Sequence, residues 1–147
     1  KMRNYTGYID NLLENEIFCF GSNTQGRHGK GTALIALSKF GARYGQPSGI
    51  QGRSYGIITT DITKKNRPSV TKEIVISEIK SLYEFALKNP NLDFLVAYTG
   101  KNSKNLSGFT NSEFAEMFSQ PNIPQNIIFE KEFSTLLNFD KNREVDI

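Results

Sequence analysis

A glycine-rich loop with basic side chains is the first place in the sequence where the residue types suggest chemistry. The loop runs from Gly21 to Gly31 and leads directly into an expected helix. Its glycines let backbone amides approach a ligand, and the start of the helix offers unpaired N–H groups and a positive dipole end. Arg27 and Lys30 add positive charge, and the loop has no acidic residue. This combination predicts a phosphate cradle, and the alternative is a tight turn that only packs helix against strand.

Two side chains near this loop have reactive groups. His28 titrates near neutral pH when unperturbed, so it is a candidate general acid or base, although a histidine on a loop can simply be solvated. Cys19 lies within an apolar run and is expected to be an inert, buried thiol. Arg53 lies further along the chain and is expected to bind phosphate together with Arg27 and Lys30, because a guanidinium pairs with phosphate through two hydrogen bonds.

Charge is distributed unevenly along the chain. The net charge is +3, yet the segment from Ile17 to Thr60 contains five basic and no acidic residues, while the rest of the chain has a balance of −2. Nine of the 12 glycines fall in this same segment. A segment without carboxylates raises the local electrostatic potential and favours an anionic partner.

Strand and helix patterns alternate along the sequence. Strands are expected at 16–20, 55–60, 93–98 and 127–129, and helices at 32–43, 71–88, 110–118 and about 132–137. Thr110 and Glu113 have the spacing of a capping box. The alternation predicts a three-layer α/β/α domain with a mainly parallel, mixed sheet.

A second polar loop is expected to lie beside the first. It follows the strand at 93–98 and runs from Thr99 to Phe109. Ligands of open parallel sheets bind outside the carboxyl ends of the strands, which is where both loops begin. This loop is therefore expected to close over a ligand through Thr99, Gly100, Lys101 and Asn102. The alternative is that these are ordinary polar residues of a loop.

Two families suggest themselves for the glycine-rich loop. Gly29-Lys30-Gly31-Thr32 resembles the end of the phosphate loop of small nucleotide kinases, but Thr24 and Arg27 stand where that loop has glycines. Gly21-Ser22-Asn23, the glycine loop and the small-residue helix from Thr32 to Ala42 resemble the macrodomain signature over about residues 16–130. The string from Phe20 to Tyr55 also resembles a set of small bacterial and phage proteins.

The macrodomain resemblance implies a ligand and a site. It implies a macrodomain-like fold that binds ADP-ribose or another phosphorylated nucleoside, with possible hydrolysis of an ADP-ribose linkage, and it gives Asn23 a ribose or phosphate contact and a catalytic role beside His28. The Gly-Asp-Ile-Thr motif that supplies the adenine-contacting aspartate in that family does not precede Asn23. The full set expected to bind ligand is Gly21, Ser22, Asn23, Gly26, Arg27, Gly29, Lys30, Gly31, Arg53, Thr99, Gly100, Lys101 and Asn102. The alternatives are a non-catalytic nucleotide-binding or protein-interaction module and, less favoured, a nucleotide kinase.

Composition limits the remaining possibilities. The chain has 147 residues and is expected to form one domain, 1–147, with a core over 16–130 and a polar tail over 138–147. One cysteine and one histidine exclude an internal disulfide and the usual zinc ligand sets, and neither a metal nor a cofactor is expected. No apolar run spans a bilayer and no signal peptide begins the sequence, so no membrane partner and a cytoplasmic location are expected. Aromatic and basic residues do not interleave, which does not favour nucleic acid as a partner.

Overall fold

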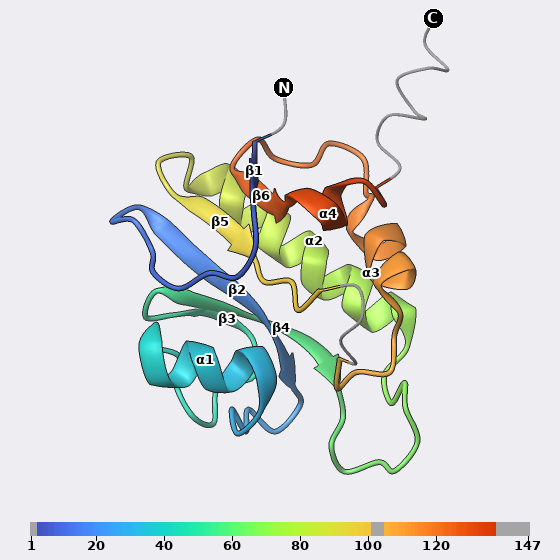
Figure 1. Cartoon of the computed structure of the whole chain (residues 1–147). Helices are drawn as coiled ribbons and strands as arrows, with labels where there is room; N and C mark the ends of the chain where they lie inside the picture. The colour runs from blue at the N-terminus through green and yellow to red at the C-terminus, as the bar shows by residue number, and fades with distance from the viewer. Residues whose placement is uncertain (1–2, 101–104, 138–147) are drawn as a thin grey trace, which may run out of the picture.

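Six strands and four helices make up the part of the chain that the structure, a computed structural model, describes: residues 3–100 and 105–137. In chain order they are β1 (Asn4–Tyr5), β2 (Glu16–Asn23), α1 (Gly31–Lys39), β3 (Gly49–Gln51), β4 (Ser54–Thr60), α2 (Lys72–Lys88), β5 (Asp93–Val96), α3 (Asn111–Phe118), β6 (Ile127–Glu130) and α4 (Lys131–Ser134). Figure 1 shows their arrangement.

All six strands belong to one mixed sheet of order β1-β6-β5-β2-β4-β3. Within the described strands, every neighbouring pair is parallel except β3 with β4, which is antiparallel. The expected α/β class with a mainly parallel sheet is therefore confirmed. Because β2, β4 and β5 are parallel neighbours, the loops that follow them all leave the same edge of the sheet.

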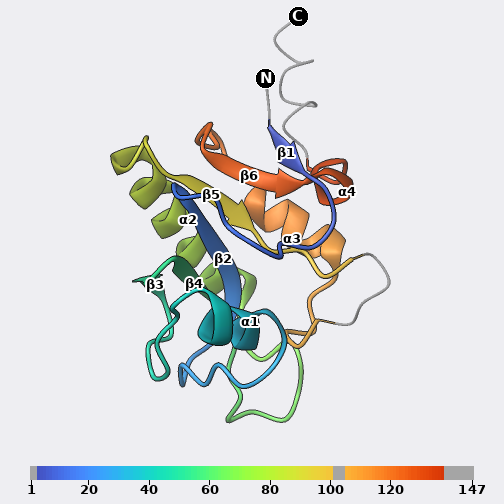
Figure 2. The ribbon, with the colours of Figure 1, turned by 60° about the vertical axis from the view of Figure 1, so that its left-hand side comes forward.

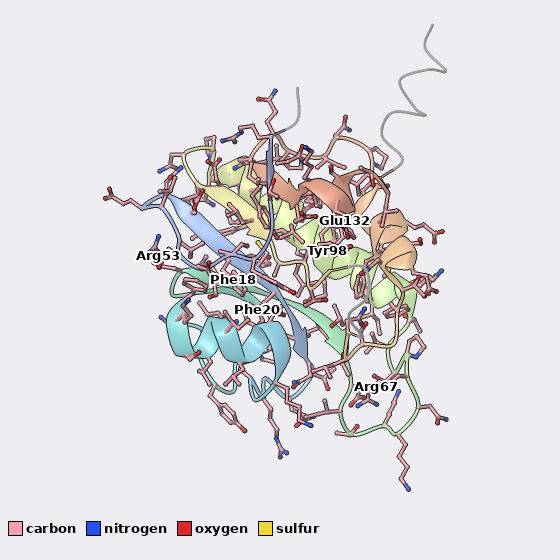
Figure 3. The ribbon with its side chains drawn as sticks, in the orientation of Figure 1. Phe18, Phe20, Arg53, Arg67, Tyr98 and Glu132 are labelled. Carbon is pink, nitrogen blue, oxygen red and sulfur yellow. The ribbon has the colours of Figure 1, made fainter. Side chains whose placement is uncertain are left out.

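Alternate residues of β2 pack on opposite faces of the sheet, as the two-residue period of a strand requires. Ile17 and Cys19 belong to the larger hydrophobic cluster, which also contains residues of α2, α3 and α4. Phe18 and Phe20 belong to a smaller cluster with apolar residues of α1, and Figure 3 shows them between β2 and α1. Helices thus lie on both faces (Figures 1 and 2), which is compatible with the predicted layers.

The N-termini of α2 and α3 are capped by threonine side chains. The Thr71 hydroxyl accepts a hydrogen bond from the Ile74 amide at 3.2 Å. Thr110 accepts from the Glu113 amide at 3.0 Å, while the Glu113 carboxylate accepts from the Thr110 amide at 2.8 Å. The predicted capping box is therefore confirmed, and both helices begin with satisfied backbone donors.

Two boundaries near the glycine-rich loop differ from the sequence-based expectation. β2 continues through Gly21 and Ser22 to Asn23, because these residues pair with β4 after the apolar run has ended. The helix expected over 32–43 ends at Lys39, because the backbone turns at Gly41 with φ of +74°. Gly41 packs against Gly52, and a Cβ atom on Gly41 would lie 3.2 Å from the Gly52 Cα. The chain beyond α1 is thereby free to form the β3–β4 hairpin.

Short elements were the least visible in the sequence. The two-residue β1 and the three-residue β3 were not predicted, because neither has an alternating pattern long enough to recognise. β5 ends at Val96 rather than residue 98, and α4 covers 131–134 rather than about 132–137. Within the described residues, no helix is both long enough and apolar enough to cross a bilayer.

Candidate functional site

A cavity of about 820 Å³ opens at the carboxyl ends of β2, β4 and β5. Three loops surround it: the glycine loop (24–30), the β4–α2 loop (61–71) and the β5–α3 loop (97–110), whose residues 101–104 lie outside the described part of the chain. The volume falls within the range of small-molecule sites in proteins, which is roughly 300–1,000 Å³. Parallel strands have thus brought together the two loops that the sequence predicts as neighbours.

A carboxylate links the glycine loop to the β4–α2 loop. The Thr24 hydroxyl donates to Asp61 Oδ1 at 3.3 Å, and the backbone amide and hydroxyl of Thr63 donate to the same oxygen at 3.0 and 2.6 Å. These hydrogen bonds lower the pKa of Asp61, with the Thr63 hydroxyl making the largest contribution. Asp61 therefore stays ionised, with its carboxylate hydrogen-bonded to Thr24 and Thr63. It is not one of the described residues that line the cavity.

The β5–α3 loop lies against the β4–α2 loop and the start of α1. A Cβ atom at Gly108, where φ is +84°, would lie 2.6 Å from Arg67 Cβ. The backbone of the β5–α3 loop therefore packs closely against the β4–α2 loop. On the other side, a Cβ atom at Gly31 would lie 3.5 Å from Leu106 Cδ1. The β5–α3 loop therefore lies against the β4–α2 loop and the start of α1, while Asp61 and Thr24 connect the β4–α2 loop to the glycine loop.

Asn23 shapes the glycine loop from within. Its Oδ1 accepts hydrogen bonds from the backbone amides of Gln25 and Arg27 at 3.1 and 3.0 Å, and its Nδ2 donates to the Arg27 carbonyl at 2.8 Å. Asn23 also lines the cavity. Its carboxamide is committed to the loop backbone, so the geometry supports a positioning role for this residue.

Gly26 anchors the glycine loop on the neighbouring segment before β3. Its carbonyl accepts from the Gly45 amide at 2.8 Å, and a Cβ atom at Gly26 would lie 2.6 Å from the Gly45 carbonyl carbon. This contact buries Gly26, which is not among the described residues that line the cavity. Gly26 therefore supports the loop rather than facing a ligand.

His28 is fully buried, with 0% of its surface exposed. Its Nε2 lies 3.1 Å from both the Gln46 carbonyl and Gln51 Oε1, and its ring meets Phe20 edge-on at 5.1 Å between centroids. Because both neighbours of Nε2 are acceptors, Nε2 is assigned the proton, while Nδ1 has no partner among the described residues. His28 does not line the described cavity. The sequence predicted a solvated or catalytic histidine, whereas the hydrogen bonds of His28 connect the glycine loop to the segment at 46–51.

The start of α1 presents backbone donors to the cavity. The N-cap residue Lys30 gives no side-chain cap, and no described residue accepts from the N–H groups of Gly31, Thr32 and Ala33. These residues and Gly29 line the cavity, and the first turn of α1 has no acidic side chain. The unpaired N–H groups and the positive end of the helix dipole favour an anion at this point.

Four cationic side chains line the cavity: Arg27, Lys30, Lys65 and Arg67. The described lining residues include no aspartate or glutamate, and none of the four is in an ion pair with a described carboxylate. Arg27 and Lys30 were among the residues that the sequence predicted to bind ligand, whereas Lys65 and Arg67 were not. The available signal was that both follow the expected strand at 55–60, but the sequence does not show that this strand lies beside the strand of the glycine loop.

The deeper wall of the cavity is apolar and aromatic. It includes Ile57, Val75, Val96, Phe114, Phe118 and Phe133. Cys19 also lies here, and burial raises the pKa of its thiol, which excludes a ready nucleophile as expected. The Tyr98 hydroxyl donates to Glu132 Oε1 at 2.8 Å (Figure 3), and burial, with help from Glu132, raises the pKa of Tyr98 to about 12.

Some of the residues expected to bind ligand lie elsewhere. Arg53 lies at the amino end of β4 and donates to the Leu13 carbonyl, far from Arg67 in Figure 3. Gly100 is not among the described lining residues, and its carbonyl accepts from Asn111 at 3.4 Å. Lys101 and Asn102 lie outside the described residues. The rest of the expected set that does line the cavity consists of Gly21, Ser22, Asn23, Arg27, Gly29, Lys30, Gly31 and Thr99.

Comparisons of the chain with models of protein families, with curated proteins and with solved structures find no match. Within residues 3–100 and 105–137, no group of three or more His, Cys, Asp or Glu side chains is placed to hold a metal ion.

Proposed function

We propose that the cavity binds a phosphorylated nucleoside, with ADP-ribose or a close relative as the ligand. The observation that carries this proposal is the uncapped N-terminus of α1, which opens with the glycine loop onto a cationic cavity whose described lining has no carboxylate. Two sources of positive potential thus meet there: the unpaired N–H groups at the positive end of the α1 dipole, and the cationic side chains. An anionic ligand is the partner that satisfies them.

The phosphates of the ligand bind at the start of α1. Residues 29–33 line the cavity, and Gly29 has open space within 4 Å where a Cβ atom would be. A phosphate oxygen can therefore approach this backbone as closely as hydrogen bonding requires. Arg27 and Lys30 stand beside these donors and balance the charge of a diphosphate.

The base or a ribose binds against the apolar wall. Tyr98 and Phe114 are half-buried and offer aromatic surface inside the cavity, while the hydroxyls of Ser22, Thr59 and Ser107 provide polar partners nearby. Since the described lining has no carboxylate, an adenine amino group finds a hydroxyl or carbonyl acceptor there rather than an aspartate. Recognition of the base by stacking and shape follows from this wall composition.

This proposal assigns the chain a macrodomain-like site within an α/β/α arrangement. Support comes from the order of parts: a buried strand ending at Asn23, a glycine loop, and a helix whose free N-terminus faces the cavity. The geometry favours a binding module, because no pair of nucleophile and general base is present among the described lining residues.

Titration calorimetry with ADP-ribose, ATP with magnesium, and cyclic nucleotides tests the proposal. We expect ADP-ribose to bind most tightly of these ligands. Preference for ATP with magnesium would support a nucleotide kinase instead, and no binding of any nucleotide would support a protein-interaction module. Arg27→Gln with Lys30→Gln is expected to weaken binding, while the exposed pair Lys80→Gln with Lys88→Gln on α2 changes the net charge equally and serves as the matched control.

A further inference from the structure

The β4–α2 loop brings more positive charge to the cavity than a diphosphate requires. Arg27 and Lys30 already match the two negative charges of a diphosphate diester, and the start of α1 adds its unpaired amides. Lys65 and Arg67 enter the same cavity from a different loop, which follows the strand adjacent to β2. Their presence needs a second explanation.

Arg67 is held in place by its surroundings. Its Nη1 donates to the Lys64 carbonyl and to the Asn66 carbonyl, the latter at 3.4 Å. Gly108 of the β5–α3 loop lies against its stem and backbone. The remaining guanidinium donors, on Nε and Nη2, have no partner among the described residues. A fixed guanidinium with free donors is suited to an oxyanion with two acceptor oxygens.

Neither Lys65 nor Arg67 forms an ion pair with a carboxylate of the described residues. The ion pairs among the described residues are Arg3 with Asp93 and Lys72 with Glu113 and Glu116, all made by other cations. The carboxylate on the same loop, Asp61, is occupied by Thr24 and Thr63. Placing four unpaired cations around one cavity costs mutual repulsion, which a ligand with additional negative charge would relieve.

We propose that Lys65 and Arg67 form a second anion subsite, which binds a phosphate monoester that the nucleotide carries in addition to the phosphates at the start of α1. This inference rests on the proposed function, because it assumes that a nucleotide occupies the cavity. A phosphate monoester adds a charge of about −1.5 to −2 at neutral pH and three acceptor oxygens, which suits one lysine and one arginine with free donors.

The test compares ligands that differ by one phosphate monoester. ADP-ribose, ADP-ribose 1″-phosphate and 2′-phospho-ADP-ribose are titrated calorimetrically into the wild type and into Lys65→Gln with Arg67→Gln. We expect the wild type to bind at least one of the monoesters about tenfold more tightly than ADP-ribose, as charged hydrogen bonds of this kind predict. The preferred compound shows which ribose faces the β4–α2 loop.

The double variant is expected to lose this preference, because its affinity for the preferred monoester should fall about tenfold more than its affinity for ADP-ribose. Lys80→Gln with Lys88→Gln is the control for net charge, and it should keep the preference. Arg67→Lys retains the positive charge but not the paired donors of the guanidinium, so this variant should keep only part of the preference for the monoester. Circular dichroism checks folding, and if the double variant unfolds, Lys65→Gln alone should reduce the preference.

The outcomes separate the two proposals. Tight ADP-ribose binding with equal affinity for all three ligands would overturn the second subsite and leave the proposed function standing. A preference that survives in the double variant would also overturn it, because the monoester would then bind elsewhere. Failure of all three ligands to bind would overturn the proposed function, and the subsite with it.

Discussion

Replacing Asn23 by alanine tests whether the glycine loop owes its shape to one side chain. The change removes three hydrogen bonds, from Asn23 to the backbone of Gln25 and Arg27, with distances of 2.8 to 3.1 Å. Each such bond is worth about 0.5–1.5 kcal/mol net, and the lower value applies here because the loop is partly exposed. The expected loss is therefore about 1.5 kcal/mol of loop ordering.

That loss translates into a measurable fall in affinity. If the loop must be ordered before a phosphate binds, the apparent dissociation constant rises by the inverse of the ordered fraction, and a loss of about 1.5 kcal/mol raises it by up to about tenfold. Calorimetric titration with ADP-ribose measures it. Turnover on ADP-ribosylated substrates, if present, should fall by more than tenfold, because the loop also positions the ligand. Thermal unfolding should show that β2 and the rest of the fold survive.

Asn23→Asp is the matched control for this reasoning. Aspartate keeps the oxygen that accepts from Gln25 and Arg27, but it loses the donor to the Arg27 carbonyl and adds a negative charge to the cavity. It should therefore bind ADP-ribose more weakly still, and added salt should narrow the difference. An alanine variant that binds as well as the wild type would refute the claim that Asn23 orders the loop.

Four further predictions follow from the cavity and its supports. Gly29→Val should fold normally, since nothing lies within 4 Å of its Cβ position, and should abolish binding in calorimetry because the side chain blocks the backbone; Gly29→Ala should bind with intermediate affinity. His28→Ala should lower the free energy of unfolding by about 3 kcal/mol, seen as a lower Tm, because it opens a cavity and removes a buried donor. Burial raises the pKa of Glu78, whose carboxylate accepts a hydrogen bond from the Ile58 amide, so the folded state keeps a proton that the unfolded state has lost and stability falls as pH rises above the usual glutamate range; in denaturant melts, the free energy of unfolding of Glu78→Gln relative to the wild type should increase as pH rises above about 4. Any hydrolysis of an ADP-ribose linkage should have a kcat that is flat between about pH 6 and 8, and a bell-shaped profile would contradict the assignment of no titrating group to the described lining.

The sequence predicted the parts of the site that depend on local pattern. The glycine loop lies between a buried strand and a helix, and the capping box at Thr110 marks the start of α3 as expected. The sheet was predictable because alternating strands and helices require parallel crossovers. What remained hidden was the pairing of strands, since the neighbour of β2 depends on packing between segments far apart in the chain.

Strand order decides which loops share the cavity. Lys65 and Arg67 enter it because β4 pairs with β2, and Arg53 is excluded because it directly precedes the amino end of β4, at the opposite end of the strand. Residue type alone made these three cations equivalent. His28 shows the same limit in another form, because Gln46 and Gln51, which bury it, come from a hairpin whose strand β3 is too short to recognise in advance.

The polar groups of the cavity define the chemistry that it can support. The described lining contains no carboxylate and no histidine, and its thiol and its Tyr98 phenol have raised pKa values, so no side chain there exchanges a proton readily at neutral pH. Hydrolysis at this site would depend on a water molecule held against the ligand by the loop backbone, with the ligand's own phosphate taking the proton. Binding needs only the amides, the cations and the apolar wall, all of which belong to the described cavity. Under the proposed function, the site serves first to hold a phosphorylated nucleoside, and any turnover would follow from how firmly the glycine loop fixes that ligand.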